Sequence, residues 1–315
     1  MKGKNWILNL SVIIVVAAMV LAAELLNEKE IIFPEITALA VGALVAPKRA
    51  WQVSRTRMVT LIAVCAVCGV LIVRYIPLPL WVQLTLAFAL CQLLYIFSRT
   101  TFAPMISAMV LPVLLGTTSW IYPLSAVVMT GIIVLMQLCF KKCGVCKEES
   151  FTPMPLPGKH DGLDMLLRIG LAGVLIVAAV GTGWRLCIAP PLLVAFTEFT
   201  RRSCKARKAP IRAVLLISLC AAAGALCRWG ICTALGLPLT LAAVLATAAA
   251  LLIMKGMNLY LPPAGALAIL PMLLPQESVV LFPLQVAVGA SVLMGLALLF
   301  FREKREKREE TCNLA

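Results

Sequence analysis

The chain has 315 residues, of which 62% are hydrophobic and only 13% are charged. A typical soluble domain carries about 25% charged residues, so this composition excludes an ordinary soluble enzyme or binding domain. The net charge of +14 does not indicate a nucleic-acid partner, because the basic residues cluster in short loops between apolar runs, as the positive-inside rule requires. These runs are apolar on all sides and long enough to cross a bilayer, which favours membrane helices over a β-barrel.

The first half of the chain, residues 1–140, is predicted to form a transmembrane unit of six segments. These segments are residues 6–25, 32–46, 58–76, 80–97, 102–115 and 120–140. The second is short, because its 15 residues would cover about 22 Å of a hydrocarbon core that is about 30 Å thick. A basic loop, residues 48–57, follows it.

The second half, residues 165–301, is predicted to repeat this plan after a polar linker, residues 141–164. Its segments are residues 165–181, 186–200, 211–234, 237–254, 261–274 and 279–301. The second of them is again short and again precedes a basic loop, here residues 201–208. A charged tail, residues 302–315, ends the chain, and we expect it on the cytoplasmic side.

Two proline-containing stretches, Leu261 to Leu274 and Phe102 to Leu115, suggest that the chain is an internal duplication. Pro104 matches Pro263, and Pro112 matches Pro271. Because proline lacks an N–H and crowds the preceding turn, each stretch is predicted to be a broken helix. One such stretch lies at the same position in each half.

The two basic loops determine the predicted topology. Short loops rich in lysine and arginine stay on the cytoplasmic side, so both loops, both termini and the linker are placed there. Each segment must then cross the membrane once. This predicts an all-α, polytopic helix bundle of about 12 transmembrane segments in two parallel repeats, in the cytoplasmic (inner) membrane. Re-entrant short segments remain an alternative. Membrane lipids are expected partners, no cleavable signal peptide is expected, and a homo-oligomer is left open.

Metal, redox and enzymatic chemistry have little support in the sequence. Most of the 12 cysteines lie in apolar runs, where cysteine acts as a small hydrophobe, and we expect free thiols. Cys143 and Cys146 form a CxxC pair, but the single histidine, His160, is distant. No HExxH and no glycine-rich phosphate loop is present. We therefore expect no cofactor, no metal and no enzymatic activity.

A small-anion site is predicted at the start of the broken helices. A helix that begins inside the membrane presents free N–H groups and a partial positive charge, which favour an anion. The candidate substrate-binding residues are Arg99, Thr100, Thr101, Pro104, Asn258, Tyr260, Pro262, Pro263, Ala264 and Gly265. The alternative interpretation is that Arg99 is a cytoplasmic anchor and that the proline pair only starts a helix.

Two acidic residues in the short segments, Glu35 and Glu198, are candidates for proton coupling. Ionisable residues in membrane segments often mark ion or proton pathways. The alternative is that both carboxylates lie at the membrane interface, where Glu35 in a first helical turn also suits the helix dipole.

The stretch Leu261-Pro262-Pro263-Ala264-Gly265-Ala266-Leu267 resembles the signature of the HPP family of transmembrane proteins, with Leu261 in the position of the name-giving histidine. The flanking Pro210-Ile211-Arg212 and Leu237-Pro238 are also similar. The resemblance covers residues 190–301 and, more weakly, residues 34–137. It implies an integral membrane protein, and some plant and cyanobacterial members of the family are regarded as nitrite transporters.

These observations predict a secondary transporter or channel for a small, nitrite-like anion, with its site between the two broken helices. The energy source would be an ion gradient or the substrate gradient itself. The alternative function is a membrane scaffold or sensor that transports nothing, which the Cys143 loop and the charged tail suggest.

Overall fold

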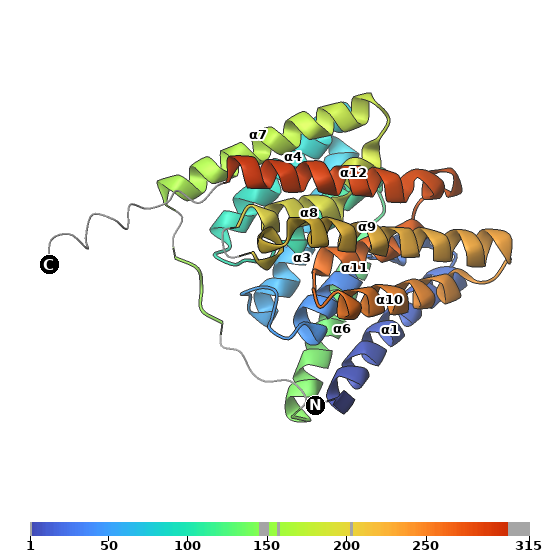
Figure 1. Ribbon diagram of the computed structural model, residues 1–315. Coiled ribbons are helices and arrows are strands. Elements are labelled where there is room, and N and C mark those ends of the chain that lie inside the picture. The colour runs from blue at the N-terminus through green and yellow to red at the C-terminus, as the bar shows by residue number, and fades with distance from the viewer. Residues whose placement is uncertain (1, 145–150, 156–157, 202–203, 302–315) are drawn as a thin grey trace, which may run out of the picture.

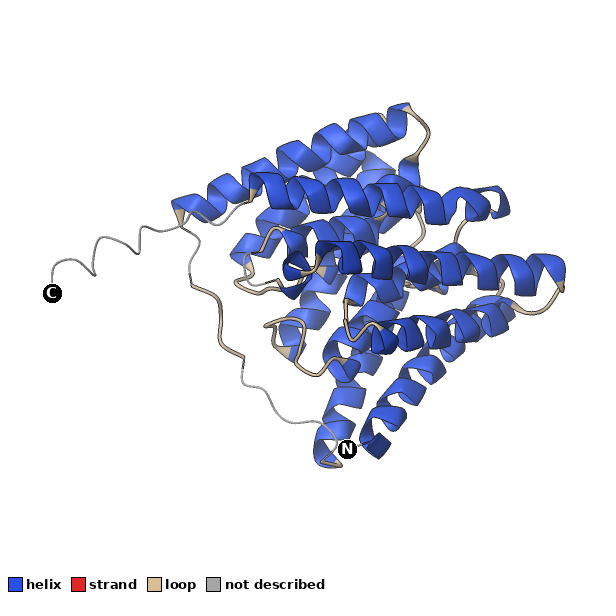
Figure 2. Cartoon of the chain, viewed as in Figure 1, coloured by secondary structure: helices blue, strands red, loops and turns tan. Residues whose placement is uncertain are grey.

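Every regular element in the described part of the chain is a helix (Figure 2). The computed structural model describes residues 2–144, 151–155, 158–201 and 204–301. Cys146 and the tail 302–315 lie outside these ranges.

The two halves have the same order of long and short helices. The first half contains α1 (Lys2–Leu25), η1 (Lys29–Ile31), α2 (Glu35–Ala40), η2 (Val41–Val45), α3 (Arg55–Tyr75), α4 (Leu80–Phe97), α5 (Pro104–Leu115) and α6 (Ile121–Lys142). The second half contains α7 (Lys159–Gly181), η3 (Arg185–Ile188), α8 (Pro190–Phe199), η4 (Lys205–Lys208), α9 (Pro210–Cys227), η5 (Arg228–Ala234), α10 (Leu239–Gly256), α11 (Pro262–Ile269), η6 (Leu270–Met272) and α12 (Gln276–Phe300). Here η2 and η5 are π-helical, and the other η elements are 3₁₀ turns.

Eight of the described helices, with spans of 18 to 25 residues, are long and apolar enough to cross a membrane. They are α1, α3, α4, α6, α7, α9 with η5, α10 and α12. The prediction of an all-α, multi-pass membrane protein is confirmed at this level. The count of twelve spans stays a prediction, because α2, α5, α8 and α11 are shorter than a membrane-spanning helix.

The four short helices form the centre of the fold, and each packs on a short helix from the other half. α2 contacts α11, and α5 contacts α8. All residues of α8 and α11 are buried, as are ten of the twelve residues of α5. The long helices surround this core, and in Figure 1 α8 and α11 lie between α12, α9 and α10.

Two equivalent glycines allow a long helix to approach a short one closely. A Cβ atom at Gly69 of α3 would lie 2.4 Å from the backbone oxygen of Met109 in α5. A Cβ atom at Gly224 of α9 would lie 2.2 Å from the backbone oxygen of Ala268 in α11. The same contact therefore occurs once in each half.

The turns before α5 and α11 also match. Arg99 and Asn258 both adopt the left-handed conformation, with φ of 53° and 48°. Only a few per cent of non-glycine residues do so. This agreement supports the residue-by-residue match on which the predicted duplication depends.

The predicted breaks at Pro112 and Pro271 have different outcomes. α11 ends at Ile269, and the chain continues as a 3₁₀ turn that contains Pro271. α5 instead continues as a helix through Pro112, which corrects the prediction for the first half. Proline at this position cannot donate to the carbonyl of Ala108, four residues earlier. The hydroxyl of Tyr122 donates to that oxygen at 3.0 Å instead, so the acceptor keeps a partner.

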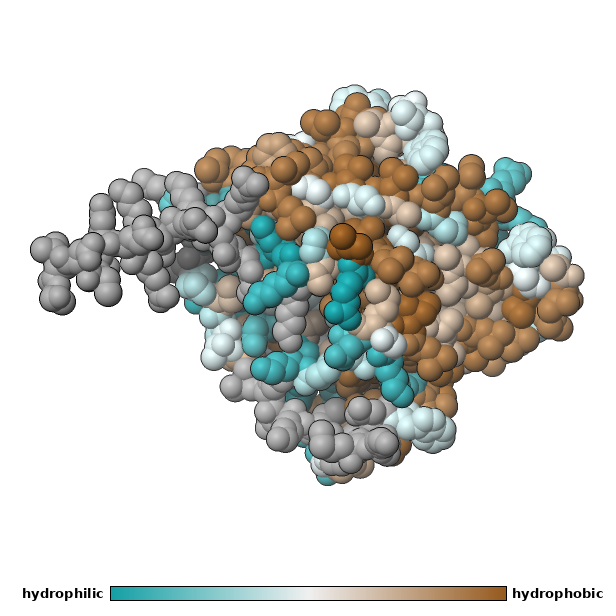
Figure 3. Space-filling view, viewed as in Figure 1, coloured by the Kyte–Doolittle hydropathy of each residue, from teal (hydrophilic) through white to brown (hydrophobic). Residues whose placement is uncertain are grey.

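One end of the fold, called the basic side here, contains residues 46–57, 98–103, 200–201, 204–209 and 257–261. Arg57 donates to the carbonyl of Ser98 at 3.1 Å, which joins the first basic loop to the turn before α5. Arg212, at the start of α9, donates to the carbonyl of Met257 before α11. In Figure 3 hydrophilic residues gather left of centre, whereas the flanks of α9, α10 and α12 are hydrophobic.

The opposite end holds the other connections. Arg74 stacks over the ring of Trp120, 5.6 Å from its centroid. Glu24, at the end of α1, accepts hydrogen bonds from the backbone N–H groups of Leu239 and Thr240, at the start of α10. These bonds replace the cap that Pro238 lacks and connect the two halves. The two basic loops lie together at the basic side, where Lys48 and Arg49 of the first line one cavity with Arg201 of the second. The predicted topology requires this shared end.

Candidate functional site

A polar cavity of about 490 Å³ lies at the basic side, where three loops meet. The first loop, 46–50, follows η2. The second follows α8 and contributes Arg201, Cys204 and Ala206, and the third, 258–261, precedes α11. The described lining residues are Ala46, Pro47, Lys48, Arg49, Ala50, Glu198, Arg201, Cys204, Ala206, Asn258, Leu259, Tyr260, Leu261 and Pro262.

Positive charge predominates in this cavity. Three of the described lining residues are cationic, Lys48, Arg49 and Arg201, and one is acidic, Glu198. Lys48 is exposed, and both arginines are half-buried. Asn258 and Tyr260 add an amide and a hydroxyl that can donate hydrogen bonds. This set of side chains suits an anion.

Glu198 is held at the wall of the cavity by a residue of the first half. Its side chain is 7% exposed, and its Oε1 accepts a 2.7 Å hydrogen bond from the indole Nε1 of Trp51. Arg201 also acts on it electrostatically. A buried carboxylate needs such partners, because burial without them costs several kcal/mol or more.

Trp51 is fixed by its own surroundings. Its ring meets Phe102 edge-to-face, with 5.5 Å between the ring centroids. A Cβ atom at Gly42 would lie 2.4 Å from Cζ3 of the same ring, so only glycine leaves room for the indole there. Trp51 is 4% exposed and therefore donates from a buried, well-packed position.

The helix start at α11 lacks the free N–H groups on which the predicted anion site depends. Pro262 and Pro263 occupy its first two positions and have no N–H. The N–H of Ala264 donates to the carbonyl of Leu261 at 3.0 Å. An anion at this end of the cavity would therefore have to be bound by side chains.

The structure does not bring the predicted residues of the first half into this cavity. Arg99 is directed to the linker, where its Nε donates to the carbonyl of Met154 at 2.7 Å. The hydroxyl of Thr101 accepts from the N–H of Gln52 at 2.7 Å. The hydroxyl of Thr100 lies 2.9 Å from that of Ser98. These contacts stabilise the turn before Pro104, which is buried.

The predicted site between the two broken helices is thus replaced by a different arrangement. Among the short helices, α5 packs on α8 and α11 packs on α2 and α8, and the cavity touches α11 only at its first residue. Of the predicted residues, Asn258, Tyr260, Pro262 and Glu198 line the cavity. Pro263, Ala264 and Gly265 are buried in α11, and Gly265 faces Thr37, whose Cγ2 would lie 3.0 Å from an added Cβ.

Glu35 lies away from the cavity, at the start of α2. Its side chain is 1% exposed, and its Oε1 accepts a hydrogen bond from the hydroxyl of Ser107 in α5. Its Oε2 has no hydrogen-bond partner among the described residues. Glu35 is thus a core carboxyl rather than an interfacial one.

Lys48, Arg49, Arg201 and Trp51 are not among the predicted residues, although the first three line the cavity and Trp51 donates to its wall. Each basic loop directly follows a short helix, and this shared position is the signal in the sequence that points to the three cations. No local signal could have paired Trp51 with Glu198, because the two are 147 positions apart.

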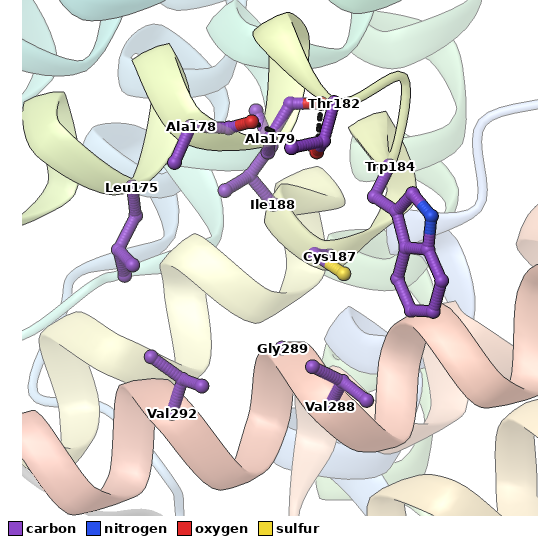
Figure 4. Close-up of a pocket in the computed structure, with 10 residues that line it drawn as sticks. All are labelled: Leu175, Ala178, Ala179, Thr182, Trp184, Cys187, Ile188, Val288, Gly289 and Val292. Atoms are coloured by element: carbon purple, nitrogen blue, oxygen red, sulfur yellow. Dashed lines mark hydrogen bonds between the residues drawn. The ribbon is translucent and has the colours of Figure 1, made fainter.

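A second hollow, of about 300 Å³, lies between α7, η3 and α12 and offers no charge (Figure 4). Its lining is mostly apolar, with Val288 and Val292 of α12 opposite Leu175 and Ala178 of α7. The hydroxyl of Thr182 already donates to the carbonyl of Ala178 at 2.8 Å. This hollow is unsuited to an anion.

The described residues contain no group of three histidine, cysteine, aspartate or glutamate side chains that could hold a metal ion. The comparisons with known proteins add no relative: no family model, no curated protein and no solved structure matches the chain. The resemblance to the HPP family therefore stays a prediction.

Proposed function

We propose that this membrane protein is a secondary transporter or channel for a small, nitrite-like anion that enters through the cavity at the basic side. The observation that carries this proposal is the lining, in which Lys48, Arg49 and Arg201 outnumber the one carboxylate. In this proposal the basic side faces the cytoplasm, since lysine- and arginine-rich short loops stay there.

The central position of the short helices supports the same proposal. Short or interrupted helices at matching positions of two halves are a common way to build a transporter site. Here the cavity opens at the ends of two of them, after α8 and before α11, so an anion in the cavity lies directly against the core.

The proposal is tested with purified protein in liposomes, by following nitrite, nitrate and formate entry. We expect flux above empty vesicles, and a reduction of about tenfold in Arg201→Gln, because one charge-assisted contact contributes on the order of 1.5 kcal/mol. Arg228→Gln is the matched control, since Arg228 lies in η5 at the opposite end.

Absence of flux for every anion, with correctly folded protein, would remove the transport proposal and favour a membrane scaffold or sensor. Equal losses in Arg201→Gln and Arg228→Gln would leave transport in place but refute the assignment of the site to this cavity.

A further inference from the structure

Glu198 is the one described lining residue whose charge opposes an anion. Its side chain is more than nine-tenths buried, but it still forms part of the cavity wall. The three cations are more exposed, so water screens their charge more effectively than that of a buried carboxylate. An anion beside an ionised Glu198 would meet a like charge in a partly buried site, where such repulsion is strong.

The neighbours of Glu198 do not remove this conflict. Trp51 donates one hydrogen bond to Oε1. Arg201 acts on the carboxylate through space, as do Tyr95 from α4 and Cys204 from the following loop. Arg168 of α7 interacts electrostatically with Tyr95, and its guanidinium donates a 3.0 Å hydrogen bond to the amide oxygen of Gln92.

The other helices that pack on α8 add no charge near Glu198. α5 and α11 contain no charged residue. The one charged residue of α12, Glu277, lies in its first turn, at the opposite end. η3 also packs on α8, but its charged residue, Arg185, precedes the start of α8, at the far end from Glu198. Protonation of Glu198 itself is therefore the simplest way to make the cavity wall neutral beside a bound anion.

We propose that Glu198 takes up one proton whenever the cavity binds its anion, so that the protein moves anion and proton together. The inference rests on the proposed function, because it requires that an anion bind here. The proton forms an O–H bond on Oε2, while Oε1 continues to accept from Trp51. The new O–H can donate to the anion, and the proton leaves when the anion leaves.

Nitrate binding to the purified protein tests this proposal, because nitrate, the anion of a strong acid, takes up no proton of its own near neutral pH. We expect uptake of about one proton per nitrate in a weakly buffered solution with an indicator dye. The affinity should fall about tenfold for each unit of rising pH once the empty site is deprotonated.

Two variants assign the proton. Glu198→Gln should bind nitrate without proton uptake and with little pH dependence. Glu35→Gln is the matched control, because Glu35 is also a buried carboxyl but lies outside the cavity, and it should behave as the wild type. Trp51→Phe keeps the carboxyl and should keep the proton uptake, with its midpoint shifted to higher pH, since the lost N–H stabilised the carboxylate.

Nitrate binding without proton uptake in the wild type would overturn the inference and leave the anion site intact. Unchanged proton uptake in Glu198→Gln would overturn it as well. A pH-independent preference for ligands that carry both an ammonium and a carboxylate group would also overturn it, because Glu198 would then pair with the ligand. If neither nitrate nor nitrite binds, the proposed function fails first.

Discussion

Trp51 links the two halves of the molecule through a single side chain. It belongs to the first basic loop, and its indole donates to Glu198 of the second half. The ring is confined by Gly42 and Phe102, so the hydrogen bond does not depend on a mobile loop side chain. At this scale, the shape of the cavity wall depends on how one aromatic ring packs.

Replacement of Trp51 by phenylalanine should therefore destabilise the protein. The variant keeps an aromatic ring but leaves the buried Glu198 without its N–H donor, which costs about 1–3 kcal/mol. Thermal unfolding in detergent should show a lower midpoint. Trp229→Phe is the control, because Trp229 is 50% exposed and lies in η5. Equal midpoints for the two variants would contradict this account.

Cys204 offers a chemical test of burial at the cavity. Burial raises the pKa of its thiol, and the nearby Glu198 carboxylate raises that pKa further. Less thiolate is then present at a given pH, and thiolate is the reactive form. We expect alkylation of Cys204 near neutral pH to be slower than that of the exposed Cys143, as followed by mass spectrometry. Similar rates for the two thiols would show that Cys204 is accessible and ionised.

At the scale of elements, the contact between a long helix and a short one sets the geometry of the core. α3 reaches α5 at Gly69, and α9 reaches α11 at Gly224. Because no side chain separates the backbones there, the short helices are held at fixed depth between the long ones. The contact at Gly224 therefore helps to position α11, whose first residue borders the cavity.

Gly224→Ala should consequently destabilise the protein by about 1–3 kcal/mol, as overpacking of a tight contact does. The added Cβ would meet the backbone oxygen of Ala268, which cannot rotate away. Gly69→Ala should behave alike. Gly295→Ala is the control, since nothing lies within 4 Å of its added Cβ, and removing a helix glycine favours folding by about 0.5–1 kcal/mol. The sign of the change in unfolding midpoint separates the two cases.

At the scale of the whole molecule, both basic loops and the turns before α5 and α11 lie at one end. Arg57 and Trp51 connect the first loop to residues of both halves, through Ser98 and Glu198. The loops that contain Asn27, Ser119 and Gly236 connect helices at the opposite end of the fold. One end of the fold should therefore face the cytoplasm as a unit.

Cysteine labelling in intact cells tests this orientation. In a cysteine-free variant, a membrane-impermeant thiol reagent should label Asn27→Cys and Gly236→Cys, and leave Lys48→Cys and Asn258→Cys unlabelled until the cells are opened. This expectation follows from the preference of basic loops for the cytoplasmic side. The reverse pattern would show that the protein has the opposite orientation in the membrane. Labelling of only one of Lys48→Cys and Asn258→Cys in intact cells would refute a shared side for the first basic loop and the turn before α11.

The sequence predicted the helical architecture well because apolar length and loop charge are local properties. The short apolar runs at residues 32–46 and 186–200, and the matched prolines of residues 102–115 and 261–274, also predicted which segments are short. The residues that line the cavity were predicted less well. Asn258, Tyr260 and Glu198 line the cavity, but Arg99 and Thr101 hold loops, and the expected free N–H groups are missing at Pro262 and Pro263.

By itself the sequence determined that this chain forms apolar helices with basic loops on one side, because hydrophobic length and charge act residue by residue along the chain. Only the tertiary structure decided which charges meet. Lys48, Arg201 and Asn258 come from three separate loops, and Trp51 reaches Glu198 across 147 positions. Such meetings depend on how α2, α8 and α11 pack against one another, and no local pattern specifies that packing.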